Sequence, residues 1–219
     1  MRGMSEYTGH VEPHQPAVRE LPALTITKVS VGGMDNNAYL LRSTATGEGL
    51  LIDAAADGSY LLSVIGDGGV GSIVTTHGDA DHWQALEEVG SATHARLYAP
   101  PLDAHRIPVE TEPLDDGDTV KVGPVELEVL RLPGHTPGHI ALLYRDPHGP
   151  PHLFAGDCIF PGGPGRTTSP ENFDSLMTAL EQKVYARLPD ETWVYTGHGD
   201  DTTLGRERPH LGEYRARGW

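Results

Sequence analysis

Four short apolar runs in this chain are each followed at once by a histidine or an aspartate. They read IVTTH, LPGH, FAGD and VYTGH, and they end at His77, His135, Asp157 and His198. Runs of this kind, bounded by turn residues, are typical of buried strands. Because rigid strands fix the loops that follow them, strand ends are where layered α/β proteins gather functional side chains. Four ends of the same chemical kind therefore predict one shared site.

The segments between these runs predict an α/β fold in which strands followed by a helix occur twice. The first half has strand-like runs at 23–31, 37–43, 49–55 and 71–77, with helical patterns at 58–67 and 82–90. The second half has a hairpin at 119–134 turning at Gly123-Pro124, strands at 139–146, 151–157 and 192–198, a helix at 171–188 and a helical tail at 204–219. Residues 1–22 are polar and lack periodicity, so we expect a loose arm followed by a single domain over 23–219.

Composition excludes several classes of partner and location. There are 16 basic and 31 acidic residues, a net charge of −15, and a surface this acidic repels nucleic acid. No run of 18 apolar residues predicts a membrane span, and the polar N-terminus does not resemble a secretory signal. Cys158 is the single cysteine, which excludes an internal disulfide and fits a reducing compartment. We expect a cytoplasmic protein acting on a small-molecule substrate, with its oligomeric state left open.

The segment TTHGDADHWQAL, residues 75–86, makes a metal site the strongest hypothesis. Together with the later strand ends it supplies seven nitrogen or oxygen donors, enough for two divalent ions sharing a carboxylate. These candidate ligands are His77, Asp79, Asp81, His82, His135, Asp157 and His198. Each has a structural alternative: Asp81 could cap the following helix, and Asp157 could only stabilise its turn.

The same residues resemble the signature of the metallo-β-lactamase superfamily, His-x-His-x-Asp-His followed by a distant His, Asp and His. The resemblance implies a four-layer αββα sandwich. It also implies a first metal held by His77, Asp79 and His135, a second held by Asp81, His82 and His198, and Asp157 between them. Within that superfamily, LPGHTPGH and AGDCIFPGGPGRT resemble glyoxalase II, the hydroxyacylglutathione thioester hydrolases, and the related persulfide dioxygenases. About 20 residues follow His198, so we expect a compact member without the long C-terminal helical region of glyoxalase II.

Asp79 departs from the signature, which has histidine at that position. Three ionised aspartates bring −3 against +4 for two divalent ions, where the usual form brings −2. A less positive centre lowers the pKa of bound water less, and harder ligands favour iron or manganese over the zinc expected from the family. Flavodiiron proteins, which share the fold, have a glutamate at the corresponding position.

The leading functional hypothesis is a metal-dependent hydrolase in which a metal-bridging hydroxide attacks an ester or thioester. No G-x-S-x-G serine-nucleophile motif is present, and Asp81 and Asp157 are the candidate catalytic carboxylates. A non-haem iron oxidative enzyme and a non-catalytic ligand-binding descendant are the alternatives. Supporting roles around the ligands are expected for Asp53, His139 and Arg166, each with a purely structural alternative. Four further histidines, His10, His14, His148 and His152, are expected at the surface.

Overall fold

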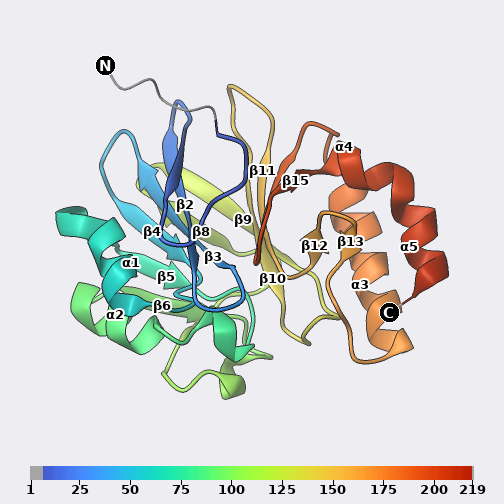
Figure 1. The fold of residues 1–219 in the computed structure, drawn as a ribbon, viewed down its shortest axis with the longest axis horizontal. Coiled ribbons are helices and arrows are strands. Elements are labelled where there is room, and N and C mark those ends of the chain that lie inside the picture. The colour runs from blue at the N-terminus through green and yellow to red at the C-terminus, as the bar shows by residue number, and fades with distance from the viewer. Residues whose placement is uncertain (1–6, 219) are drawn as a thin grey trace.

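A computed structural model describes residues 7–218, which form two β-sheets packed face to face (Figure 1). In the first sheet the strands lie side by side in chain order. They are β1 (Ala17–Glu20), β2 (Leu24–Val31), β3 (Asn36–Ser43), β4 (Gly49–Ile52), β5 (Ser72–Val74), β6 (Arg96–Ala99) and β7 (Glu112–Pro113). Pairing is antiparallel from β1 to β4 and parallel from β4 to β7.

The second sheet has the spatial order β15-β14-β11-β10-β9-β8. Its strands are β8 (Thr119–Val122), β9 (Val125–Arg131), β10 (Ile140–Tyr144), β11 (His152–Gly156), β14 (Trp193–Thr196) and β15 (Thr202–Thr203). Only the β11–β14 pair is parallel among these described strands. A small ribbon, β12 (Ile159–Phe160) with β13 (Gly163–Pro164), follows β11.

Helices cover the outer face of each sheet, which completes the four-layer αββα arrangement (Figure 1). The first sheet carries α1 (Gly58–Ile65) and α2 (Leu86–Thr93). The second carries α3 (Pro170–Ala179), its π-helical continuation η4 (Leu180–Tyr185), α4 (Leu204–Glu207) and α5 (Leu211–Arg217). Short 3₁₀ turns occur at Gly66–Gly68 (η1), Ala80–His82 (η2), Ala104–Arg106 (η3) and Arg208–His210 (η5).

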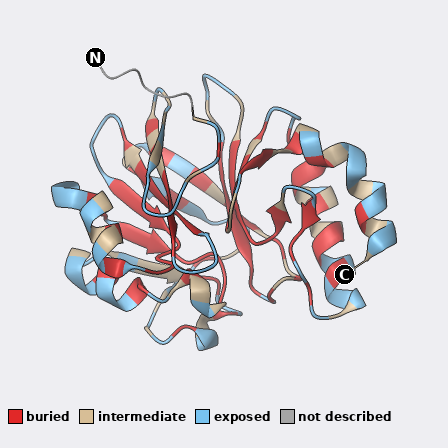
Figure 2. Cartoon of the chain, viewed as in Figure 1, coloured by how far each residue is buried: buried red, intermediate tan, exposed pale blue. Residues whose placement is uncertain are grey.

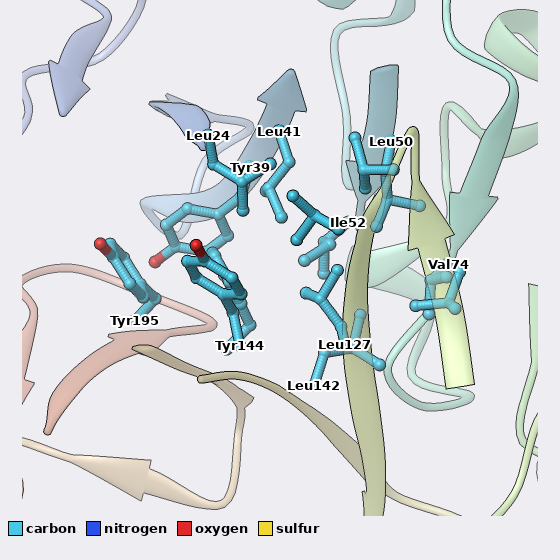
Figure 3. Close-up of a cluster of buried hydrophobic side chains, with 14 of the residues drawn as sticks. Leu24, Tyr39, Leu41, Leu50, Ile52, Val74, Leu127, Leu142, Tyr144 and Tyr195 are labelled. Carbon is cyan, nitrogen blue, oxygen red and sulfur yellow. The ribbon is translucent and has the colours of Figure 1, made fainter. Parts of the chain in front are cut away.

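Alternation along the strands explains why four layers form. In β2, Leu24 and Ile26 point between the two sheets, while Val29 and Val31 pack with the helices on the outer side. Central strands such as β4, β10 and β11 are therefore buried along their whole length, and Figure 2 colours the middle of the molecule mostly as buried. Figure 3 shows the central layer, in which Leu41 and Ile52 of the first sheet meet Leu127 of the second. Burial of each such side chain contributes roughly 1.5–3 kcal/mol, which fixes the two sheets against each other.

Several expected elements are confirmed and several are corrected. The hairpin turns at Gly123-Pro124 as predicted, and Cys158 is buried in the core. The expected loose arm is wrong for Ala17–Glu20, because this segment pairs with β2 as an edge strand whose alternate side chains are solvent-facing. The helix expected at 82–90 begins at Leu86, after the separate turn η2.

Two further expectations concern the second half of the chain. The single helix expected at 171–188 changes to π geometry at Leu180, which turns Leu180, Val184 and Tyr185 all into the core. His152 is fully buried rather than exposed, because it stacks between Tyr144 and Tyr195. No helix within residues 7–218 combines the length and apolarity needed to cross a membrane.

Candidate metal centre

The first half of the candidate site is built at the carboxyl ends of the parallel strands β4 and β5. Asp53 follows β4 directly, and His77 lies three residues beyond the end of β5. Because the two strands are parallel and adjacent, their ends meet at one edge of the sheet. The chain then turns through Gly78 and Asp79 into η2, which carries Asp81 and His82. Four candidate ligands therefore come from one short loop.

The second half comes from loops of the other sheet. His135 lies between β9 and β10, Asp157 follows β11, and His198 follows β14. The structure brings all seven candidate ligands together in overlapping groups, with donor atoms of each group within 4.8 Å of one another. The groups are His77, Asp79 and His135; His77, His82 and Asp157; and Asp81, His82 and His198.

Each of the four histidines uses its Nδ1 in a contact to an oxygen outside the cluster. The acceptors are Thr76 Oγ1 for His77 (3.0 Å), Asp53 Oδ2 for His82 (3.0 Å), the Arg166 carbonyl for His135 (2.6 Å) and the Met34 carbonyl for His198 (2.9 Å). Carbonyl and carboxylate oxygens can only accept, so Nδ1 of these rings carries the proton. The Thr76 hydroxyl donates to Asp53 Oδ2 (2.8 Å) and so accepts from His77. All four Nε2 lone pairs are consequently directed at the cluster.

The distances between donor atoms match those around small divalent ions. Asp79 Oδ2 lies 3.2 Å from His135 Nε2 and 3.8 Å from His77 Nε2. Asp81 Oδ2 lies 3.4 Å from His198 Nε2 and 3.8 Å from His82 Nε2. Tetrahedral coordination with bonds of about 2.0–2.1 Å places ligands about 3.3 Å apart. These separations fit without rearrangement of the loops.

Asp157 lies between the two groups. Its Oδ2 is 3.6 Å from His135 Nε2 and 3.3 Å from His198 Nε2, while its Oδ1 is 3.4 Å from His82 Nε2. Three buried donor atoms of the cluster, His77 Nε2, His135 Nε2 and Asp157 Oδ1, lack a hydrogen-bond partner. Buried polar atoms are nearly always satisfied, so these orphaned lone pairs indicate a site shaped for cations. The residues present therefore fit a pair of metal ions.

The charges of the cluster are strongly coupled. The contact with His198 lowers the pKa of Asp81 to about 2. Burial raises the pKa of Asp157, but His198 and His82 outweigh it and hold that pKa well below its ordinary value. Burial lowers the pKa of His198, yet Asp157 and Asp81 raise it more, to about 10. The carboxylates are thus ionised and attract positive charge, supplied either by protons or by metal.

Two glycines permit the close approach of backbone at the centre. Gly156 has φ +50°, and a Cβ there would lie 2.8 Å from His139 Nε2 and 2.9 Å from Thr76 Oγ1. A Cβ on Gly197 would lie 1.9 Å from Asp157 Oδ1 and 2.9 Å from His82 Cε1. The glycine before the ligand in FAGD and in VYTGH is therefore a steric requirement.

The three residues expected to support the ligands take different positions. Asp53 is buried and its Oδ2 contacts His82 Nδ1. His139 Nε2 accepts the Asp157 backbone N–H (3.0 Å), its ring stacks on His77, and burial lowers its pKa to about 3. The Arg166 side chain is exposed, and only its backbone carbonyl contacts His135.

Sequence reasoning missed several residues that shape the site. Asn36 Nδ2 donates to both the carbonyl and Oδ2 of Asp81, at 2.9 Å each. Asp103 is fully buried and joins the loops carrying His77 and His135, and the Arg106 guanidinium pairs with Asp79 Oδ1 at 2.6 Å. The one available signal was the buried-strand context of Asn36, because Asp103 and Arg106 lie in a segment without regular pattern.

The sequence model described as "Metallo-beta-lactamase superfamily" matches residues 31–198, the span that contains every candidate ligand. The chain belongs to this superfamily. Its fold therefore implies a divalent metal at the His/Asp cluster.

Similar proteins add information on possible chemistry. An uncharacterised protein of Aquifex aeolicus is 32% identical over 87% of this chain and 98% of its own length. A protein named hydroxyacylglutathione hydrolase from Fuscovulum blasticum is 37% identical over 75% of this chain, which spans 62% of that hydrolase. A solved structure titled TTHA1623 in a di-iron-bound form has a TM-score of 0.69 at 32% identity, covering 83% of this chain and 96% of the other.

Proposed function

We propose that the chain is a metal-dependent hydrolase of ester or thioester bonds in small molecules. The observation that carries the proposal is the uniform orientation of four histidines, each with Nδ1 bound outside the cluster and Nε2 facing inward. Outer hydrogen bonds of this kind orient metal-binding imidazoles and fix their tautomers. The similarity to hydroxyacylglutathione hydrolases supports hydrolysis of a thioester as the specific reaction.

The donor groups are compatible with two ions. His77, Asp79 and His135 would hold the first ion, and Asp81, His82 and His198 the second, with Asp157 shared. When bound, divalent ions at such a site activate water as a nucleophile and polarise a substrate carbonyl.

The chain's own residues contribute orientation and proton transfer. Asn36 holds Asp81 through two hydrogen bonds, so one carboxylate is fixed at the edge of the cluster while remaining partly exposed. An ionised carboxylate in this position can accept a proton from an attacking water. Asp157 is almost completely buried and is placed by the His139 contact to its backbone, which suits a structural ligand.

The leaving group is inferred from the protonation pattern of the histidines. All four ligand histidines use Nδ1 outside the cluster and Nε2 within it, so none of them is free to protonate a departing amine. A thiolate leaves without a proton, whereas an amide nitrogen requires one. The lack of a free histidine acid therefore favours thioesters as substrates, oxygen esters second, and amides least.

The test is a matched set of substrates with metal analysis. Protein purified without added metal is analysed for zinc, iron and manganese, then assayed on a hydroxyacylglutathione thioester and on the oxygen ester and amide of the same acyl group. We expect thioester turnover that Asp157→Ala abolishes and Asp57→Ala, a substitution outside the cluster, retains. Equal loss in both variants, or turnover of the amide alone, contradicts the proposal.

A second candidate is an oxidative non-haem iron enzyme. Asp79 adds a third carboxylate to the centre, which favours iron, and the relative TTHA1623 is described in a di-iron-bound form. Iron in the purified protein, together with oxygen consumption on a thiol-derived substrate and no thioester turnover, would select this candidate instead.

A further inference from the structure

The two oxygens of Asp79 face different partners. Oδ2 points into the cluster, 3.2 Å from His135 Nε2 and 3.8 Å from His77 Nε2. Oδ1 points away from it and pairs with the Arg106 guanidinium at 2.6 Å. A carboxylate divided in this way offers the metal position one oxygen only. In that respect it imitates the single Nε2 of a histidine, the residue that the superfamily signature has at this position.

Arg106 is brought to Asp79 by a buried anchor. The turn η3 begins after Asp103, whose carboxylate accepts the Gly78 N–H (3.0 Å), the Thr136 hydroxyl (2.5 Å) and the Gly138 N–H (2.8 Å). Asp103 thereby ties η3 to the loop before Asp79 and to the loop after His135. The Arg106 N–H donates to the Asp103 carbonyl at 2.9 Å, which sets the start of the arginine side chain.

The arginine stem also lies directly against the ligand loop. A Cβ on Gly78 would be 2.9 Å from Arg106 Cδ and 3.0 Å from Arg106 Cβ. A larger residue at position 78 would press on the arginine stem, so glycine leaves room for the stem beside the ligand loop. Three features are therefore connected: Gly78, the turn η3 and the ion pair between Arg106 and Asp79.

We propose that Arg106 is a positioning residue that holds Asp79 as a single-oxygen ligand and offsets the negative charge that Asp79 adds in place of histidine. The inference rests on the metal centre proposed above, but not on the identity of the substrate. One unit of positive charge beside one unit of negative charge gives the first metal position the same formal charge that a neutral histidine would. The replacement at position 79 is thus compensated by a residue 27 positions later.

This arrangement makes the effect of Arg106 depend on the residue at position 79. With Asp79 present, removing the guanidinium removes a positive charge near the metal but also frees a partly exposed carboxylate to rotate away. Loss of such an outer partner weakens metal binding by about 10–100-fold, and we expect this effect to exceed the relief of repulsion. With histidine at 79, the guanidinium has no carboxylate partner there and repels the metal. Removing it in that background should strengthen metal binding.

The experiment is a double-mutant cycle read by metal affinity. Wild type, Arg106→Gln, Asp79→His and the double variant are stripped of metal, and the affinity and stoichiometry of Zn²⁺ and Mn²⁺ are measured by chelator competition without substrate. Arg96→Gln, which removes another arginine–carboxylate pair, is the matched control, and Arg106→Lys tests the need for the guanidinium. Thermal melting of the metal-free variants shows that each is folded.

We expect Arg106→Gln to weaken the first ion at least tenfold in wild type and to strengthen it in the Asp79→His background, with Arg106→Lys intermediate and Arg96→Gln unchanged. The same direction of effect in both backgrounds, or an effect no larger than that of Arg96→Gln, overturns the inference while leaving the metal centre intact. A wild-type chain that binds neither ion overturns both.

Discussion

Replacing Asp53 by asparagine separates the geometry of the centre from its chemistry. Asp53 is buried, has φ +58°, and accepts three contacts, from the Thr76 N–H (2.7 Å), the Thr76 hydroxyl (2.8 Å) and His82 Nδ1 (3.0 Å). Asparagine has the same shape and tolerates a positive φ, so the backbone need not change. Its amide oxygen can keep the Thr76 N–H bond, but its NH₂ group then faces the N–H of His82.

The cost follows from that conflict between two donors. His82 can relieve it by moving its proton from Nδ1 to Nε2, which restores a hydrogen bond to the asparagine but blocks the lone pair directed at the metal. We expect metal affinity at the second position to fall about 10–100-fold, or about 1.4–2.7 kcal/mol. In the metal-free chain a charge-assisted bond is replaced by a neutral one, a loss of about 1–2 kcal/mol, which lowers the melting temperature by roughly 2–8 °C.

The assay is chelator competition for the two ions, combined with melting of the metal-free protein. Asp57→Asn is the control, because Asp57 also has a positive φ (53°) and also accepts a backbone N–H and a histidine, Gly32 and His14. We expect that control to retain both ions. If Asp53→Asn binds two ions with wild-type affinity, Asp53 does not set the tautomer of His82 and the reasoning fails.

Three other predictions concern packing, the loop anchor and pH. Gly197→Ala should abolish binding of both metal ions, measured by metal analysis, because the alanine Cβ would overlap Asp157 Oδ1. Retained metal would show that the backbone moves to accommodate the Cβ. Asp103→Ala should leave three donors without their acceptor and destabilise the chain by about 3 kcal/mol or more in urea unfolding, in contrast to a surface aspartate. In the metal-free chain, the pKa of His198 is raised from 6.5 to about 10. The protonated imidazole therefore stabilises the folded chain fully below pH 6.5, and this stabilisation is lost as pH rises through 10. His198→Gln should remove this part of the alkaline decrease in melting temperature.

The strand ends were predictable because their signal is local. The apolar runs ending at His77 and His198 predict both a strand and the polar residue that follows it. Parallel strands place such ends at one edge of their sheet. The same locality identified Asp53 one residue after β4. Metal binding by these residues stays a prediction, as does the single domain over 23–219, whereas the arm expected at 1–22 is corrected at Ala17–Glu20.

What could not be predicted depends on contacts between distant loops. Arg106 acts through Asp79, and this pairing exists only because Asp103 anchors η3 on two other loops. His152, in a segment rich in proline and glycine, was expected at the surface because its neighbours are polar. It is buried because Tyr144 and Tyr195 come from adjacent strands of the same sheet. Sequence patterns describe a residue's neighbours along the chain, not those across a sheet.

The division of the donors between two sheets has a consequence for how the protein matures. The first sheet supplies His77 to His82, and the second supplies His135, Asp157 and His198, the last of them after β14. A nascent chain on the ribosome cannot complete the second ion's set of donors until His198 has emerged, and the donors proposed for the first ion, which end at Asp157, also need both sheets. Metal loading would therefore follow folding, and bound ions would then join the two sheets. Chelation should open the seam between the sheets first, where amide exchange at the ends of β5 and β14 would report it.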